Sequence, residues 1–264
     1  MIKWALAALS TACVLTGAAY LIGMPTAVRA NLVQAPVGGG PPPPTWTLKA
    51  NTFLLCADNP CNTNTSITTP PIDTMGSDLI VADVTFFANP PGAGCSTPNV
   101  FGDSKGNTWS TAKTVQNNGT SDGQLNLLYV QAPTVGSGHT FNFNKECFSS
   151  IYVLAFSGSV TSPLDVTNSG SNASTETSQA SGSILPTQNG DLIITGLMGS
   201  GLVSGISVDS SIIQANAAGG GTPNENYTTG LGYFAQSTAA TINPTWSWTT
   251  ARSAAAAVAS FKSH

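Results

Sequence analysis

The residues that could perform acid–base or nucleophilic chemistry are few in this sequence and far apart. Glycan hydrolysis requires two carboxyl groups that face one bond, but Asp78 and Asp83 lie in one expected strand at a spacing that points them to opposite faces. A serine or cysteine nucleophile requires a histidine base, and the sequence holds only His139 and His264. His139 follows Gly-Ser-Gly, which predicts an exposed turn residue. These spacings predict a protein that is not an enzyme and uses no cofactor.

Two further pairs of residues could bind a ligand. Asp103 and Asn107 offer oxygens in an Asp-Ser-Lys-Gly-Asn turn and are the candidate cation ligands, although calcium needs six or more oxygens. Glycans bind to exposed aromatic rings, and Trp109 and Tyr227 are the candidates because neither has an aromatic counterpart elsewhere in the chain's repeated strands. Packing of Trp109 against the neighbouring turn is the alternative for that residue.

The N-terminal region predicts export. Residues 1–30 form a signal peptide or a signal anchor, because Lys3 precedes an uncharged stretch from Trp4 to Val28. Residues 31–45 form a Pro/Gly-rich spacer, which cannot build a helix or a sheet ladder. We therefore expect an extracytoplasmic protein, secreted or on the cell surface, that meets a membrane only through its first segment if that segment is retained.

Four cysteines follow the export segment, and an even number in an oxidising compartment predicts two disulfides. Cys56 with Cys61 would close a local loop and Cys95 with Cys147 a long one, although three pairings are open. A zinc site is the alternative, but the sequence has no CxxC spacing.

The charge content excludes one class of partner. Only 8% of residues are charged, 12 acids stand against 8 bases, and no run of Lys or Arg could neutralise phosphates. Nucleic acid is therefore not an expected partner.

An internal repeat is the most informative feature of the sequence. Asp78–Val81 reappears as Asp191–Ile194, each after a turn-like pair, so we expect both aspartates to shape corners. Further segments recur in the same order: Val115-Gln116 as Ile213-Gln214, Leu127–Val130 as Leu231–Phe234, Thr140–Asn144 as Thr245–Thr249, and Phe156 as Phe261. The repeat predicts a β-sandwich over 46–264 with halves 46–160 and 161–264.

The repeated segments have the two-residue period of β-strands. One strand has an apolar face of Ile80, Ala82, Val84 and Phe86. Ile151–Phe156 is apolar throughout, which predicts a central strand covered on both sides. Ala254–Ala257 favours a helix by propensity, but the repeat aligns it with the strand around Tyr152, so we predict a strand. The matched aromatics Phe141 and Phe143, Trp246 and Trp248 are predicted to be core.

The fold class follows from these strands and from the turns between them. The Asp103–Asn107 turn predicts a tight hairpin, and turn signals divide each half into about seven strands. The sequence predicts an all-β fold, an antiparallel, jelly-roll-like β-sandwich made of two pseudo-repeats. Two tandem immunoglobulin-like sandwiches are the alternative. The short link from Ser157 to Pro163 favours one compact body.

The order of these motifs resembles a recurrent module of secreted or surface proteins of bacteria and their phages. The residues that carry the resemblance are Ser77–Leu79, Asp103–Trp109, Val153–Gly158, Pro163–Val166, Gly190–Leu192 and Ala259–Lys262. The resemblance implies a β-sandwich on the cell exterior and no particular activity.

These observations predict a non-catalytic extracellular protein with a structural or adhesive role in a cell surface, filament or virion-like assembly. Its polar, nearly uncharged strands suit edge pairing or broad weak contacts, so the expected partners are further copies of the chain or surface glycans. A glycan-binding module is the first alternative, and a polysaccharide-active enzyme is the second.

Overall fold

Every regular element that the computed structural model describes is a β-strand. The described residues are 46–54, 66–88, 100–117, 123–144, 147–172, 176–200, 204–210, 212–220 and 227–264, with the backbone alone at 87, 88, 147, 148, 200, 215–220 and 227. No helix within these ranges is long and apolar enough to cross a membrane. The predicted export segment (1–30), the spacer (31–45) and Cys56, Cys61 and Cys95 lie outside the described residues.

Eight strands build the first half of the described chain. They are β1 (Thr47–Leu54), β2 (Ile67–Thr68), β3 (Leu79–Ala88), β4 (Phe101–Asp103), β5 (Ser110–Gln116), β6 (Gly123–Gln131), β7 (Phe141–Phe143) and β8 (Cys147–Ser157). Five of them form inner sheet 1, in the order β1-β8-β3-β6-β5. The other three form outer sheet 1, in the order β2-β7-β4.

The second half repeats this arrangement strand for strand. Its strands are β9 (Ser159–Ser171), β10 (Glu176–Ala180), β11 (Asp191–Ser200), β12 (Ser207–Val208), β13 (Ile213–Gly220), β14 (Tyr227–Gln236), β15 (Thr245–Arg252) and β16 (Ala254–Ser263). Inner sheet 2 has the order β13-β14-β11-β16-β9, and outer sheet 2 has the order β10-β15-β12. Adding eight to each strand number of the first half gives the second, so the predicted pseudo-repeat is confirmed.

The pairing within each half is jelly-roll-like. In the first half β1 pairs with β8, β2 with β7 and β3 with β6, all antiparallel. This is the nested pairing of a jelly roll. The departure is β5, which pairs with β6 at the edge of the inner sheet. The second half pairs in the same way, so the fold is the predicted antiparallel sandwich of two pseudo-repeats and not two immunoglobulin-like domains.

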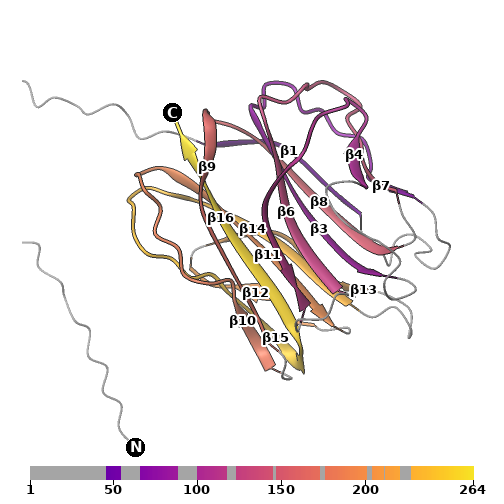
Figure 1. Cartoon of the computed structure of the whole chain (residues 1–264), viewed down its shortest axis with the longest axis vertical. Helices are drawn as coiled ribbons and strands as arrows, with labels where there is room; N and C mark the ends of the chain where they lie inside the picture. The colour runs from indigo at the N-terminus through magenta and orange to yellow at the C-terminus, as the bar shows by residue number, and fades with distance from the viewer. Residues whose placement is uncertain are drawn as a thin grey trace, which may run out of the picture. The chain divides into compact units, whose positions relative to one another are not determined.

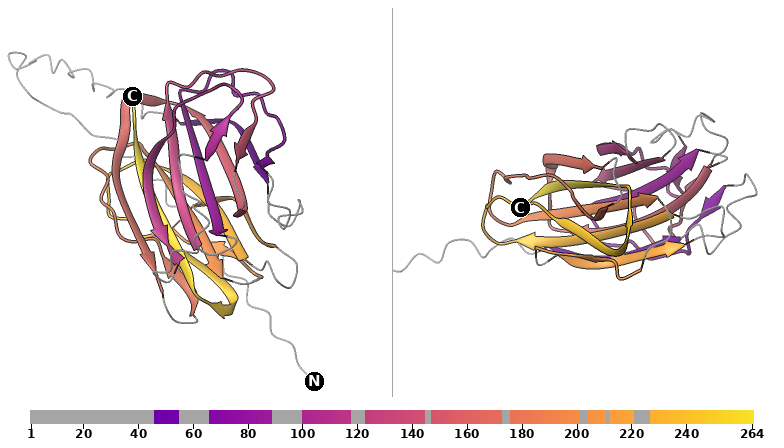
Figure 2. Two further views of the ribbon diagram at one scale, coloured as in Figure 1. Left: turned by 45° about the vertical axis from the view of Figure 1, so that its right-hand side comes forward. Right: turned by 90° about the horizontal axis from the view of Figure 1, so that it is seen from below.

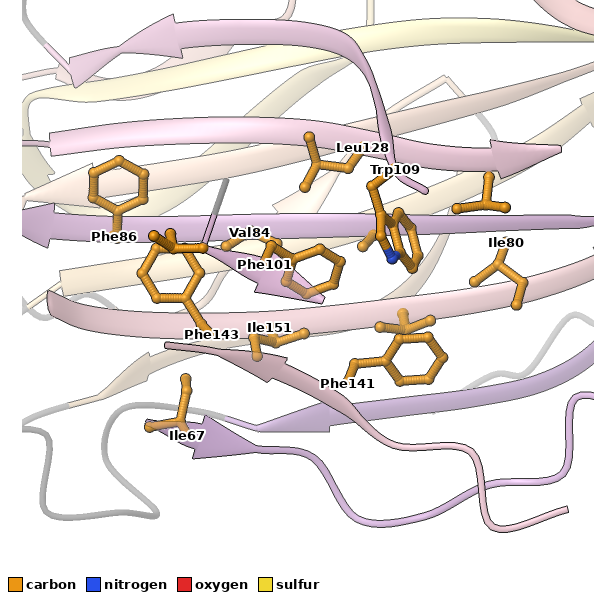
Figure 3. Packing of buried hydrophobic residues seen from close by; sticks show 14 of the residues in the cluster. Ile67, Ile80, Val84, Phe86, Phe101, Trp109, Leu128, Phe141, Phe143 and Ile151 are labelled. Atoms are coloured by element: carbon orange, nitrogen blue, oxygen red, sulfur yellow. The ribbon is translucent and has the colours of Figure 1, made fainter. Parts of the chain in front are cut away.

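The four sheets stack in layers, with the inner sheets face to face (Figures 1 and 2). One shared core joins them, in which Leu79 and Val81 of inner sheet 1 pack with Leu192 and Ile194 of inner sheet 2. Figure 3 shows the core between inner sheet 1 and outer sheet 1, where the predicted apolar face of β3 meets the aromatics of β4 and β7. A single residue, Gly158, separates β8 from β9, so the two halves form one continuous body.

The halves contact each other reciprocally, as two copies related by a twofold axis do. Tyr129 of β6 packs edge-on against Phe261 of β16, with ring centroids 5.5 Å apart. The corresponding residues, Tyr233 of β14 and Phe156 of β8, make the same contact at 5.4 Å. The inner sheets therefore form a pseudo-twofold interface within one chain.

Two local predictions have opposite outcomes. Ala254–Ala257 begins a fully buried strand, as the repeat predicted, because its small side chains fit between two packed layers. The predicted hairpin at Asp103–Asn107 is wrong. The turn is present, with Gly106 at a φ of 74°, but it carries the chain from β4 in outer sheet 1 to β5 in inner sheet 1. The residues of a tight turn favour the turn itself but do not specify which sheet the next strand joins.

Candidate functional site

Asp103, at the end of β4, is surrounded by polar groups. Its Oδ1 accepts hydrogen bonds from the backbone N–H of Lys105 (2.8 Å) and the Asn107 amide (3.1 Å), and its Oδ2 accepts one from the indole N–H of Trp109 (2.7 Å). His139 Nε2 lies 3.0 Å from Oδ1. Burial opposes ionisation of Asp103, but the contacts with His139, Trp109, Lys105 and Asn107 outweigh it and lower its pKa.

Thr74, His139 and Asp103 lie in the order of a nucleophile–base–acid triad. Thr74 Oγ1 is 2.9 Å from His139 Nδ1, and the opposite ring nitrogen faces the carboxylate. All three side chains are fully buried, and Thr74 Oγ1 also accepts the backbone N–H of Gly136. A hydroxyl sealed from substrate cannot attack one. The array therefore connects the end of β4 to the loops that hold Thr74 and His139. The predicted exposed turn histidine is wrong, because His139 stacks on Phe141 inside the fold.

The second half shows what this cluster does, because it fills the same place with apolar residues. Asp103 lies opposite Phe141 in the β4–β7 ladder, and Val208 lies opposite Trp246 in the β12–β15 ladder. The repeat aligns His139 with Pro244, and Ile242, two residues before Pro244, forms a bridge to Ile184 that resembles the bridge between His139 and Ile72. Val208 and Ile242 belong to one hydrophobic cluster. The polar contacts of Asp103 and His139 in the first half thus correspond to apolar packing in the second half. This indicates that the polar contacts have a structural role.

The two cation candidates use their oxygens within the protein. The Asp103 oxygens face N–H groups, and Asn107 Oδ1 accepts the backbone N–H of Thr134 at 2.7 Å. Throughout the described ranges, no group of three or more His, Cys, Asp or Glu side chains could hold a metal ion.

Of the two glycan candidates, the structure places one in the core. Trp109 is 6% exposed and lies between Phe101 and Phe141, with ring centroids 4.8 and 6.1 Å away (Figure 3). We therefore withdraw Trp109 as a glycan ligand, because stacking on a sugar requires an exposed ring face. The alternative interpretation, in which Trp109 packs beside the neighbouring turn, describes this residue correctly. The side chains of Tyr227 and Cys147 lie outside the described residues, so the Tyr227 candidate and the disulfides stay predictions.

Asp78, which directly precedes β3, and Asp191, which opens β11, have different surroundings. Asp78 accepts the backbone N–H groups of Gly158 and Ser159, both at 3.0 Å, and so fixes the passage from the first half to the second. This is the predicted corner role. Asp191 is fully buried beside Asp165. Burial and the neighbouring Asp165 carboxylate raise the pKa of Asp191 to about 7.

Asp165 is the ionised member of this carboxyl pair. Burial opposes its ionisation, but hydrogen bonds from the backbone N–H and hydroxyl of Thr187, both at 2.7 Å, outweigh it and lower the pKa of Asp165. Lys262 Nζ lies 3.8 Å from Asp165 Oδ1 and supports the charge. The pair joins β9 to the turn before β11.

Asp83 lies on the pseudo-twofold contact between the inner sheets. It is fully buried and both of its carboxyl oxygens are without a hydrogen-bond partner. The repeat makes Gly196 its counterpart, and a Cβ on Gly196 would lie 3.1 Å from the Asp83 carboxyl carbon. Glycine on one side of the axis therefore leaves room for the carboxyl on the other. Burial raises the pKa of Asp83 well above its ordinary value.

Comparison of the chain with family models, with curated proteins and with solved structures finds no match. The resemblance to the secreted bacterial module stays a prediction.

Proposed function

We propose that this protein is a non-catalytic extracytoplasmic β-sandwich with an adhesive role at a cell surface or in an extracellular assembly. One observation supports this most directly. The side chains of the triad-like Thr74, His139 and Asp103 are buried in the fold, and the second half has apolar residues, among them Val208 and Ile242, in the corresponding region. Residues retained for catalysis would require access to a substrate.

The edges of the inner sheets favour adhesion to a different partner over polymerisation by strand addition. All four edge strands, β1, β5, β9 and β13, carry register shifts in their pairing. Bulges twist an edge away from the flat geometry that a further strand needs. Of the two predicted partners, surface glycans are therefore favoured over further copies of the chain.

A polysaccharide-active enzyme is the second candidate, and one observation favours it. Asp191 has a raised pKa and Asp165 a lowered one, which is the division of roles between a general acid and a base. Against it, Asp191 is fully buried, the Asp165 side chain is only 5% exposed, and both Asp165 oxygens are bound by Thr187.

Sedimentation with insoluble polysaccharides tests the proposal. The full chain is incubated with cellulose, chitin or bacterial cell-wall sacculi, and both protein in the pellet and released reducing ends are measured. We expect retention on at least one material with no release above the protein-free control. Release that Asp191→Asn abolishes would establish the enzyme instead, and no retention on any material would contradict the adhesive role.

A further inference from the structure

One junction between the halves has an open groove. It has a volume of about 460 Å³ and is lined from the first half by Thr108, Ser110, Tyr129 and Gln131. The second half supplies the N-terminal part of β9, Thr161 to Leu164. This volume falls within the range of about 300–1,000 Å³ typical of small-molecule sites.

A break in the repeat creates the groove. Phe261 of β16 lies opposite Leu164 of β9, and Ser263 lies opposite Ser159, so four β9 residues face one residue of β16. β1, the counterpart of β9, pairs regularly at this place, with Leu48 opposite Phe156 and Thr47 opposite Ser157. Bulges of this kind commonly aim side chains at a functional site.

The opposite junction shows what the groove would hold if the halves were identical. Trp46 lies two residues before Leu48, and its indole packs edge-on against Phe156 and donates to the Gly190 carbonyl of the other half at 2.9 Å. The residue two before Leu164 is Ser162, which is exposed. A flat ring thus fills one junction, whereas a serine leaves the other open.

The lining has the chemistry of a site for a neutral sugar. Hydroxyl and amide groups donate and accept hydrogen bonds, and within the described part of the chain the side chains of Thr108, Ser110, Gln131, Thr161 and Ser162 have no protein hydrogen bonds of their own. The half-buried ring of Tyr129 and the half-buried side chain of Leu164 supply apolar surface for sugar C–H groups. No lining residue is charged.

We propose that this groove binds a neutral hexose or N-acetylhexosamine unit of a surface glycan. The inference rests on the proposed adhesive function and names its ligand class and its site. Because the groove needs β5 and β6 of one half and β9 of the other, it exists only in the stacked arrangement of both halves.

Titration calorimetry of the full chain tests the groove, with cellotriose, maltotriose, triacetylchitotriose and the anionic trigalacturonic acid as probes. We expect at least one neutral trisaccharide to bind with a Kd on the order of 1 mM or tighter, and trigalacturonic acid not to bind. Ser162→Trp, which copies Trp46, should weaken binding at least about tenfold. Ser171→Trp, at the exposed far end of the same strand, should bind as the wild type does.

Gln131→Ala adds no bulk and covers the case in which Ser162→Trp does not fold. Loss of one neutral hydrogen bond should weaken binding about threefold or more. The inference is overturned if no neutral trisaccharide binds or if trigalacturonic acid also binds. It is likewise overturned if Ser162→Trp folds and both it and Gln131→Ala bind like the wild type. If Ser162→Trp is retained on insoluble polysaccharide as the wild type is, the protein adheres through a surface other than the groove, which overturns the inference and leaves the proposed function intact. If the wild-type protein is not retained, both the groove and the proposed adhesive function are contradicted.

Discussion

Asp83 gives the sharpest energetic prediction, because it places a carboxyl group without partners between the two inner sheets. Burial raises its pKa well above the ordinary value, so the folded protein keeps this group protonated where the unfolded chain has lost its proton. Unfolding then releases a proton, and the free energy of unfolding must fall as pH rises above the unfolded pKa of about 3.9. Asp83→Asn keeps the shape of the protonated acid and removes the titration.

The size of this pH effect follows from the release of one proton per molecule on unfolding. Each pH unit between the unfolded and folded pKa values of Asp83 lowers the free energy of unfolding by about 1.4 kcal/mol. From pH 5 upwards the wild type should therefore lose stability relative to Asp83→Asn until the pH passes the raised pKa of Asp83. The variant is expected to be the more stable protein at pH 7, with the difference shrinking towards pH 4.

Urea unfolding at several pH values, followed by tryptophan fluorescence, measures this difference. Asp73→Asn makes the same chemical change at an exposed residue and is the matched control for the substitution itself. Parallel pH profiles for the wild type and Asp83→Asn would refute the assignment of Asp83 as a buried, protonated group.

Three further predictions follow from the other clusters. Asp103→Val or His139→Ile alone should cost about 3–5 kcal/mol in urea unfolding, because each leaves one member of a buried pair without its partner, whereas the double variant, which copies Val208 and Ile242, should recover most of that loss; additive losses would contradict the structural role. Asp191→Asn should flatten the fall in stability between pH 4 and about pH 7, measured by thermal unfolding, and an unchanged slope would contradict the raised pKa. The unfolded, unreduced mature protein should take up no thiol reagent at Cys56, Cys61, Cys95 or Cys147, and labelling of any of them would contradict the two predicted disulfides.

The strands and their repetition could be predicted because both depend on local patterns. The alternation in β3 and the paired aromatics of β7 and β15 show which faces are buried. The alanine run at the start of β16 was assigned correctly only through its alignment with β8, since its own composition favours a helix. A repeat supplies tertiary information that a single segment lacks.

The contacts of the polar residues could not be predicted in the same way. Thr74 and His139 lie in two separate loops and Asp103 at the end of β4, and no local spacing indicates that they meet. Trp109 was a candidate for exposure because the second half has no matching aromatic, but its indole fills the core and its N–H requires Asp103. The burial of Asp83 depends on the stacking of the inner sheets, which only the assembled halves define.

We propose that a partner contacts this protein at the junction groove, away from the buried acids and histidine. Hydrogen–deuterium exchange of the full chain, with and without the neutral trisaccharide that binds most tightly, tests it most directly. We expect slower exchange in Ser159–Leu164 and in β6, with no change around Asp103 and His139. Slower exchange confined to the loops that hold Asp103 and His139, or to the Asp165 and Asp191 pair, would contradict it.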